Sequence, residues 1–487
     1  MGADELIETE AWGSSLASWS PLVTLLAAFG VIVVGLLVTG RGSALERIPN
    51  ALERLTGLPG WAATSIGTVM IGLVVAGEGF YSDVAWHIAL GRDEELFTAP
   101  HTSIVVGLGL IFCSAAFGIA AATATGAEVG FRWGALRVPW SMVPLAALGG
   151  AALAGFPLDE VWHAAYGVDV TMWSPTHMIM ILGASFAGLA CWLVLAEARV
   201  APTDSRWARG AHVVTGWLTL QALAAPQGEF AFGVPQFQQM FHPVLVVLAG
   251  AVALTAIRIV HGGGWALGIT LGSTVLMNVG LFGDEGSPIP TREGGLYVAS
   301  AVAVELAALL VGTAHRVRFA VASGLGVATL GLAGEWIWNR GAFQPWNANL
   351  LPDALWFCLV VGVGGALVGT AFGGVVVGDH PARAVPGRIL AGAAAAVVVA
   401  LVLPLPRSTG DVTAAISLVE AGPDAAFVAV ELTPADAADD ARWFQTISWQ
   451  GGGLVIAEME EVGPGRYASD KAIPVTGRGK ALVRLHR

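Results

Sequence analysis

Long apolar runs alternate with short polar stretches over the first 405 residues of the chain. A helix that crosses a bilayer needs about 20 predominantly apolar residues, and twelve segments meet this requirement. They lie near residues 18–40, 62–80, 101–125, 139–157, 176–196, 210–226, 242–260, 264–282, 296–314, 317–334, 354–378 and 388–405. The second and fourth run into polar stretches, so their boundaries are the least defined. The pattern predicts an all-α polytopic membrane protein with about 12 transmembrane helices.

After residue 405 the apolar pattern changes to that of strands. Apolar and polar residues alternate in "AAFVAVEL", "WFQTISW" and "KALVRLHR", and the turn signals "GPD", "QGGG" and "GPG" separate such stretches. A period of two with Gly and Pro between the segments is typical of a small antiparallel β domain. We therefore expect a membrane domain over residues 1–405 and an extracytoplasmic, Ig-like β-sandwich over residues 406–487.

Composition agrees with a membrane location. The chain is 55% hydrophobic and only 12% charged, and it contains 64 glycines, whereas soluble domains are about 25% charged. Small residues allow helices to pack closely inside a bilayer. The net charge of −12 argues against a nucleic-acid partner. The lipid bilayer is thus the first partner that the sequence implies.

The arginines predict an orientation. One set of alternate loops holds 13 of them, whereas the opposite set, up to the last helix, holds only Arg92, Arg292 and Arg340. Because cytoplasmic loops are enriched in Lys and Arg, the first set is expected in the cytoplasm. The chain would then be a multi-pass protein of the plasma membrane, with both termini and the C-terminal domain extracytoplasmic.

A polar motif occurs twice between apolar segments. The stretches "DVAWHIALGRDEELFTAPH" (83–101) and "DEVWHAAYGVDVTMWSPTH" (159–177) share the template D-x-x-W-H-x3-G-x-D-x7-H, 76 residues apart. Residues four apart share one face of a helix, and the second His begins the antiparallel partner helix at the same depth. Each hairpin should therefore bring one carboxylate and two imidazoles together, a recurrent transition-metal ligand set.

The candidate ligands follow from this template. The two predicted sets are Asp83, His87 and His101, and Asp159, His163 and His177. The second Asp of each copy, Asp93 or Asp169, is a candidate to orient a ligating imidazole through its other ring nitrogen. The tryptophan of each copy, Trp86 or Trp162, is expected to shield the site.

A third, degenerate copy occupies residues 335–353. Glu335, Asn339 and Asp353 stand at the offsets of the Asp and the two His. These are weak ligands for a soft metal, so this copy is either a relic of the repeat or a hard-cation site. A looser relative surrounds Glu229 and His242, where "FHP" again opens a helix.

The motif also has a structural interpretation. His and Trp are common at membrane interfaces, and an Asp–His pair can cap a helix. Two copies with every polar position in register favour metal binding. By contrast, His212, His261, His315 and His380 each stand singly at a helix end on the arginine-rich side, and we interpret them as interfacial filler.

The two ligand sets resemble those in the C subunit of the copper membrane monooxygenases, the family of particulate methane and ammonia monooxygenases. There a carboxylate or amide is followed four residues later by a His, and then by a second His after a hairpin turn. The resemblance covers about 95 of the 487 residues and rests on spacing, order and membrane side. It implies a copper-dependent oxidoreductase that reduces dioxygen and acts on a small apolar substrate arriving through the lipid.

Several functional alternatives remain open from the sequence. Asp/His/His also suits non-haem iron or zinc. Besides an enzyme, the chain suits a carrier or handling protein for copper or another transition metal, with Glu78 and Glu305 as the acidic residues within spans, or a non-catalytic accessory subunit. Other subunits or a second copy of the chain are candidate partners.

Overall fold

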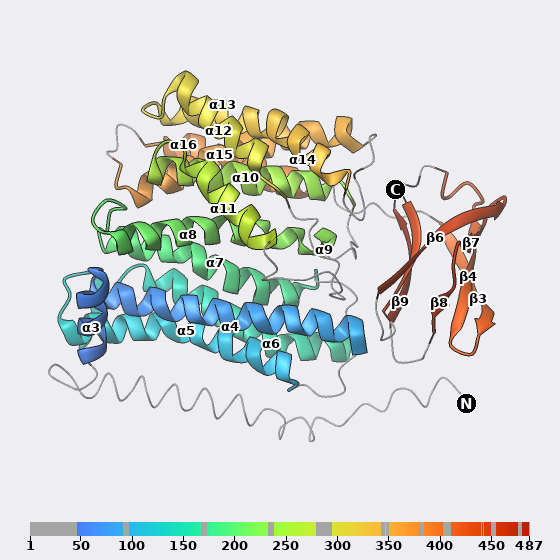
Figure 1. The fold of residues 1–487 in the computed structure, drawn as a ribbon, viewed down its shortest axis with the longest axis horizontal. Coiled ribbons are helices and arrows are strands. Elements are labelled where there is room, and N and C mark those ends of the chain that lie inside the picture. The colour runs from blue at the N-terminus through green and yellow to red at the C-terminus, as the bar shows by residue number, and fades with distance from the viewer. Residues whose placement is uncertain are drawn as a thin grey trace.

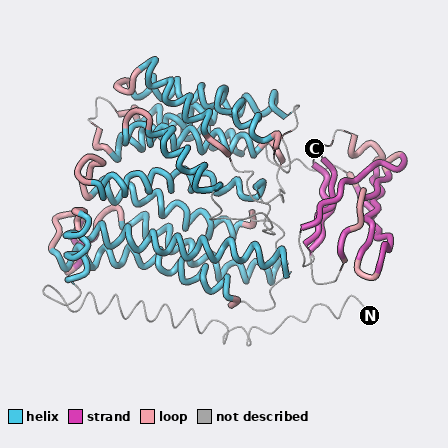
Figure 2. The backbone as a smooth tube through the Cα atoms, in the orientation of Figure 1, coloured by secondary structure: helices cyan, strands magenta, loops and turns pink. Residues whose placement is uncertain are grey.

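The computed structural model describes two parts of the chain, a helical bundle and a C-terminal β domain (Figures 1 and 2). The described residues are 46–90, 97–166, 173–231, 238–278, 295–341, 346, 350–379, 384–402, 411–439, 441, 443–449, 454–475 and 480–486. The predicted first span, 18–40, lies outside them.

The long helices of the bundle run back and forth along one direction, and the short α3 stands across them at one end (Figure 1). In chain order they are α3 (Arg47–Thr56), α4 (Gly60–Leu90), α5 (Ala99–Thr125), α6 (Met142–Tyr166), α7 (Pro175–Glu197), α8 (Arg206–Ala224), α9 (Gly228–Ala231), α10 (Phe241–His261), α11 (Trp265–Asn278), α12 (Val298–Val311), α13 (Arg316–Gly326), α14 (Leu332–Asn339), α15 (Leu350–Val376) and α16 (Gly387–Val402). A 3-10 turn, η3 (Ala225–Gln227), precedes α9, and a π-helical turn, η4 (Val327–Gly331), joins α13 to α14. A short hairpin of β1 (Phe131–Trp133) and β2 (Leu136–Val138) connects α5 to α6.

The helical, membrane-type character of this part is confirmed. Among the described residues, seven helices are long and apolar enough to cross a membrane. They are Gly60–Val84, Ala99–Thr125, Met142–His163, Pro175–Glu197, Phe241–His261, Arg316–Asn339 and Leu350–Val376. Three further apolar helices are shorter, namely Trp265–Leu276, Val298–Val311 and Gly387–Val402. Eleven of the twelve predicted spans thus overlap helices, but the number that cross a bilayer stays a prediction.

Two boundaries differ from the predicted ones in a way that matters for the motif. The predicted span 62–80 ends ten residues before the end of α4 at Leu90. Likewise, the predicted span 139–157 ends before the end of α6 at Tyr166. Polar residues at a helix end do not break the backbone hydrogen bonding. The carboxylate and first His of both motif copies therefore lie on helices.

The C-terminal part is an antiparallel β domain. Its strands are β3 (Thr413–Gly422), β4 (Ala425–Thr433), β5 (Trp443–Trp449), β6 (Leu454–Gly463), β7 (Arg466–Ser469), β8 (Ile473–Pro474) and β9 (Lys480–His486). The hydrogen-bonded path runs β3-β4-β7-β6-β5-β9, with β8 beside β4. Buried and less buried residues alternate along β4, as predicted.

The predicted two-sheet sandwich is met only in part, because β6 belongs to both halves. Its first half pairs with β5 and its second half with β7, so the described strands form one continuous, bent sheet. Val430, Phe444, Met459 and Ile473 pack together as part of its core. β5 also contacts α4, and Figure 1 shows the β domain at the end of the bundle where α4 finishes.

Candidate metal centre

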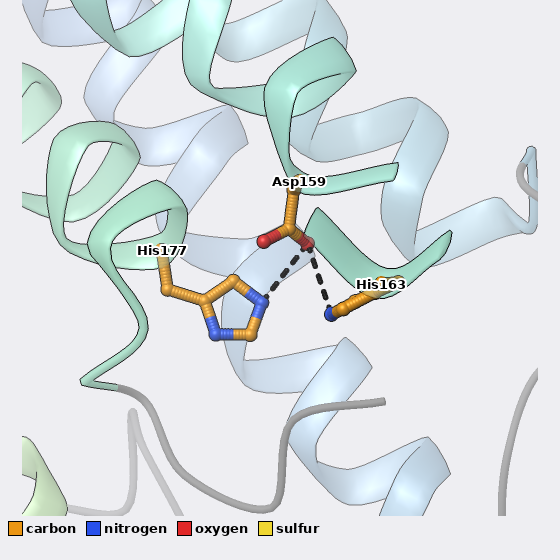
Figure 3. Close-up of side chains that lie close together, drawn as sticks. All are labelled: Asp159, His163 and His177. Carbon is orange, nitrogen blue, oxygen red and sulfur yellow. Dashed lines mark ion pairs between the residues drawn. The ribbon is translucent and has the colours of Figure 1, made fainter. Parts of the chain in front are cut away.

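The second motif copy forms a compact group of three side chains (Figure 3). Asp159 and His163 stand one turn apart near the end of α6, and His177 stands in the first turn of α7. Oδ2 of Asp159 lies 3.1 Å from Nε2 of His177 and 3.6 Å from Nε2 of His163. The structure therefore brings the second predicted set together around one carboxylate oxygen.

The local sequence explains this geometry. Ser174 caps α7, because its hydroxyl accepts the backbone N–H of His177, and Pro175 occupies the first turn, where a missing N–H costs nothing. The first copy has the same start, with Thr98 as the cap of α5 and as acceptor of the backbone N–H of His101. In both copies the cap fixes the first turn of the helix, and with it the second His.

Thr176 adds a contact that the template did not include. Its hydroxyl donates to Oδ1 of Asp159, and its side chain is buried. One carboxylate oxygen is thus held by Thr176, while the other faces the two imidazoles. Motif comparison missed this residue because the first copy has Pro100 at the same position.

The spacing of the three polar atoms suits an ion. Ligand atoms about 2.1 Å from one metal lie about 3.0–3.4 Å apart at octahedral or tetrahedral angles. One ligand atom from each of the three residues lies within 4.8 Å of the others, and this is the metal-type group of His, Cys, Asp and Glu found among the described residues. Side-chain exposures of 14–27% leave room for a further ligand from outside.

The first motif copy is described in part. Nε2 of His101 lies 3.0 Å from Oδ1 of Asp83, which repeats the contact between His177 and Asp159. His87 lies on α4, one turn beyond Asp83, but its side chain is outside the described residues, as is that of Trp86. Asp93 and Asp169 also lie outside them.

The repeat extends into the helices as a pair of glycine contacts. A Cβ placed on Gly107 of α5 would lie 2.4 Å from the backbone N of Ala76, and one placed on Gly183 of α7 would lie 2.9 Å from that of Ala152. Both pairs keep the 76-residue offset of the motif. The two helix hairpins therefore pack with equivalent close contacts.

A second glycine pair lies closer to the motif. Gly79 and Gly155 each stand four residues before the Asp, and a Cβ there would lie within 3.2 Å of the next helix's backbone, at the carbonyl of Pro100 or Thr176. These glycines let the carboxylate-bearing helix approach the start of its partner. Both glycine pairs recur at the 76-residue offset, so aligning the two copies beyond their polar residues would have identified these glycines.

The two ligand sets are neighbours in space. The ring of His101 contacts Phe156 edge to face with centroids 5.9 Å apart, and Phe156 precedes Asp159 by one helical turn on α6. Phe97 packs on the ring of Phe156. A buried aromatic side chain of the second hairpin's first helix therefore packs against the second His of the first hairpin.

The aromatic partner of the second set packs locally. The Trp162 ring lies 4.4 Å from that of Tyr166, one turn later on α6. The ring nitrogen of Trp173 donates to the carbonyl of Pro226, and this bond connects the segment before α7 to η3, which follows α8.

The degenerate copy is held by a different set of contacts. Both oxygens of the buried Glu335 accept backbone N–H groups, those of Leu296 and Tyr297, and thereby cap the start of α12. Asn339 accepts the backbone N–H of Trp346, and Asp353 is exposed. The side-chain oxygens of Glu335 and Asn339 thus accept hydrogen bonds from backbone N–H groups.

His242 is buried, with its ring stacked on Phe230 at 4.7 Å. Its Nδ1 accepts the indole N–H of Trp346 at 3.0 Å. Because Trp346 also donates its backbone N–H to Asn339, His242 and the degenerate copy are linked through one tryptophan. The side chain of Glu229 lies outside the described residues.

The interpretation of His212 and His261 as isolated interfacial residues is wrong. His212 is only 1% exposed, accepts the indole N–H of Trp192 at Nδ1, and bonds the carbonyl of Val200 through Nε2. Nε2 of His261 in turn bonds the carbonyl of His212. His212 and His261 are therefore a hydrogen-bonded pair inside the bundle, which the apolar sequence around each of them did not indicate. His315 is exposed, and His380 lies outside the described residues.

The acidic residues considered for transport have local partners. Oε2 of Glu305 lies 2.8 Å from Nε of Arg258, and its other oxygen accepts the backbone N–H of Ala266. Glu78 accepts the hydroxyl hydrogen of Ser82 on the same helix.

Comparison of the chain with protein-family models, with curated proteins and with solved structures finds no match in any of the three.

Proposed function

We propose that this membrane protein binds a transition metal at Asp159, His163 and His177. The proposal rests on one observation, the approach of one ligand atom from each side chain to within 4.8 Å of the others. Two imidazoles and a carboxylate leave coordination positions for water or substrate. The repeated Asp–His contact in the other hairpin, Asp83 to His101, supports a second site of the same kind that includes His87.

Copper is the metal that we propose first, with iron and zinc as alternatives. Nitrogen-rich sets with one carboxylate accept all three ions. The preference for copper comes from the resemblance of the two motifs to the C subunit of the copper membrane monooxygenases. When bound, copper would supply dioxygen reduction, and the protein would hold and shield it.

The activity that we propose is that of an oxidoreductase or an oxygenase-like subunit acting on a small apolar substrate. The proposed ligand sets lie at the ends of apolar helices, where a substrate dissolved in lipid would reach them, and the buried Phe156 gives His101 an apolar neighbour. A site that excludes water favours such substrates.

Metal transport is the alternative function. It requires ionisable or broken elements at mid-membrane. The ion pair of Glu305 with Arg258 gives this acidic side chain a structural role, which argues against its use as a transport ligand.

The proposed topology has twelve spans in the plasma membrane with both termini outside. The motif copies and the β domain share one end of the bundle (Figure 1), and β5 contacts α4. The arginine-rich loops would face the cytoplasm.

Elemental analysis of the purified full chain tests the metal proposal. The wild-type protein should retain copper, and the double variant His163→Ala/His177→Ala should lose the copper bound at this site, which lowers the copper content per chain, while keeping its helical circular dichroism. His315→Ala removes an exposed imidazole at the start of α13 and serves as the matched control. Equal metal content in all three proteins would overturn the proposal, and retention of iron or zinc alone would replace copper.

A further inference from the structure

The hairpin between α5 and α6, which we call the arginine hairpin (residues 131–138), places two like charges opposite each other. Arg132 of β1 pairs directly with Arg137 of β2. Directly opposed residues of an antiparallel pair project from the same face with Cβ atoms about 5 Å apart, and like charges there are destabilising. An anion bound between the two guanidinium groups would remove this repulsion.

The hairpin is firmly built despite this repulsion. Gly130 and Gly134 both have positive φ, and a Cβ on Gly130 would lie 1.8 Å from the carbonyl oxygen of Val138. The backbone N–H of Arg137 donates to Thr123 of α5 at 2.9 Å, and Val138 is buried. The opposed arginines are therefore part of a fixed element.

Neither arginine forms an ion pair with a carboxylate of the described residues. Elsewhere at this end of the bundle arginines are neutralised, as Arg316 is by a two-pronged contact with Asp379. Glu197, the acidic residue at the end of α7, accepts the backbone N–H groups of Trp140 and Ser141 instead. Within the described part of the chain, the two cations of the arginine hairpin thus have no carboxylate partner.

The surroundings indicate a lipid rather than a free ion. Trp133 and Trp140 flank the two arginines with 72% and 63% of their surface exposed. Tryptophans of this kind anchor proteins at the headgroup level of a bilayer. The short helix α3, at the same end in Figure 1, likewise exposes Ile48 and Leu55 next to Arg47 and Arg54.

We propose that Arg132 and Arg137 together bind the phosphodiester of an anionic phospholipid, with Trp133 and Trp140 in the adjoining lipid interface. Planar guanidinium groups match the paired oxygens of a phosphate, and a single headgroup between them removes their repulsion. This site lies at the opposite end of the bundle from the metal centre, so it does not depend on the proposed function.

Native mass spectrometry of the full chain in neutral detergent tests this site, with phosphatidylglycerol and phosphatidylcholine as probes. The wild-type protein should prefer phosphatidylglycerol, and Arg132→Gln/Arg137→Gln should weaken its binding about 25-fold, or about fivefold for each charge. The lysine pair Arg132→Lys/Arg137→Lys should retain part of the preference. Arg318→Gln/Arg388→Gln removes two exposed arginines and should leave it unchanged.

Three outcomes would overturn the proposal. In the first, the Arg132→Gln/Arg137→Gln variant binds phosphatidylglycerol as tightly as the wild type does. In the second, the Arg318→Gln/Arg388→Gln control loses as much affinity as that variant, so that only total charge matters. In the third, equimolar inorganic phosphate displaces the lipid, so that the site takes the free anion. Lipid-free melting temperatures control for folding. The glutamine pair should melt no lower than the wild type, because it removes the repulsion, and the single variant Arg132→Gln provides the same test at the exposed member of the pair.

Discussion

The hydroxyl of Thr176 donates to Oδ1 of Asp159, and this contact orients the carboxylate so that Oδ2 faces His163 and His177. This hydrogen bond would hold the proposed ligand in one direction before a metal binds. Residues that orient ligands in this way commonly influence metal affinity about 10–100-fold. In the metal site that we propose, Thr176 is a positioning residue, and it belongs to the second hairpin alone.

Replacing Thr176 by Val should weaken metal binding by about tenfold or more, because the isosteric side chain removes the hydroxyl and leaves Oδ1 without this donor. Competition with a chelator of known affinity measures the change. Thr176→Ser keeps the donor and should bind nearly as the wild type does. Equal affinities for the Val and wild-type proteins would show that Asp159 needs no such support or does not bind the metal.

The glycine contact between α6 and α7 predicts a loss of stability on substitution. Gly183→Ala places a methyl group 2.7 Å from the carbonyl oxygen of Leu148, so the hairpin must open, at a cost of about 1–3 kcal/mol. Thermal unfolding in detergent measures this change, and metal affinity should fall with it because Asp159 and His177 move apart.

Gly67→Ala is the matched control for this change, since nothing lies within 4 Å of a Cβ at that helical position. It should stabilise α4 by up to about 1 kcal/mol through helix propensity. Equal effects of the two substitutions would contradict the role of close helix contact.

Much of the second candidate site was predictable from the sequence. The Asp159–His163 spacing of four and the hairpin that returns His177 to the same depth are local consequences of helix geometry. The position of the Asp and first His of each copy at a helix end was predicted too, but the apolar runs 62–80 and 139–157 stop short of the ends of α4 and α6, because apolar runs mark the lipid-contacting part of a helix and not its end. The contact partners of Thr176 and Gly183 come from packing between helices, for which one sequence has no direct signal.

The same limit explains the error over His212. Its flanking sequence is that of an interfacial helix end, whereas its partners Trp192 and Val200 lie on or beside another helix. A polar side chain is buried when distant residues satisfy its hydrogen bonds, and those residues are known only from the fold. Similarly, alternation identified β4, but only the pairing of β6 with both β5 and β7 distinguishes one bent sheet from two.

Glu335 tests whether the degenerate repeat has a structural role. Glu335→Ala removes both acceptors at the start of α12, so two backbone N–H groups, those of Leu296 and Tyr297, lose their partner at a cost of about 1–3 kcal/mol each. Glu335→Gln keeps one acceptor and should cost less. Metal content per folded chain should equal that of the wild type in both variants, by elemental analysis. A stable Ala variant that has lost metal would instead make Glu335 a ligand.

The proposed topology predicts opposite labelling of two exposed positions. The native cysteines Cys113, Cys191 and Cys358 are all buried, so an added cysteine reports its own side of the membrane. Val462→Cys in the β domain, at a side chain 65% exposed, should react with a membrane-impermeant maleimide in intact cells. Ala314→Cys, in the exposed turn before α13, should react only after permeabilisation, because the neighbouring arginines favour the cytoplasm. Labelling of Ala314→Cys in intact cells without labelling of Val462→Cys would reverse the orientation and place the metal centre at the inner face.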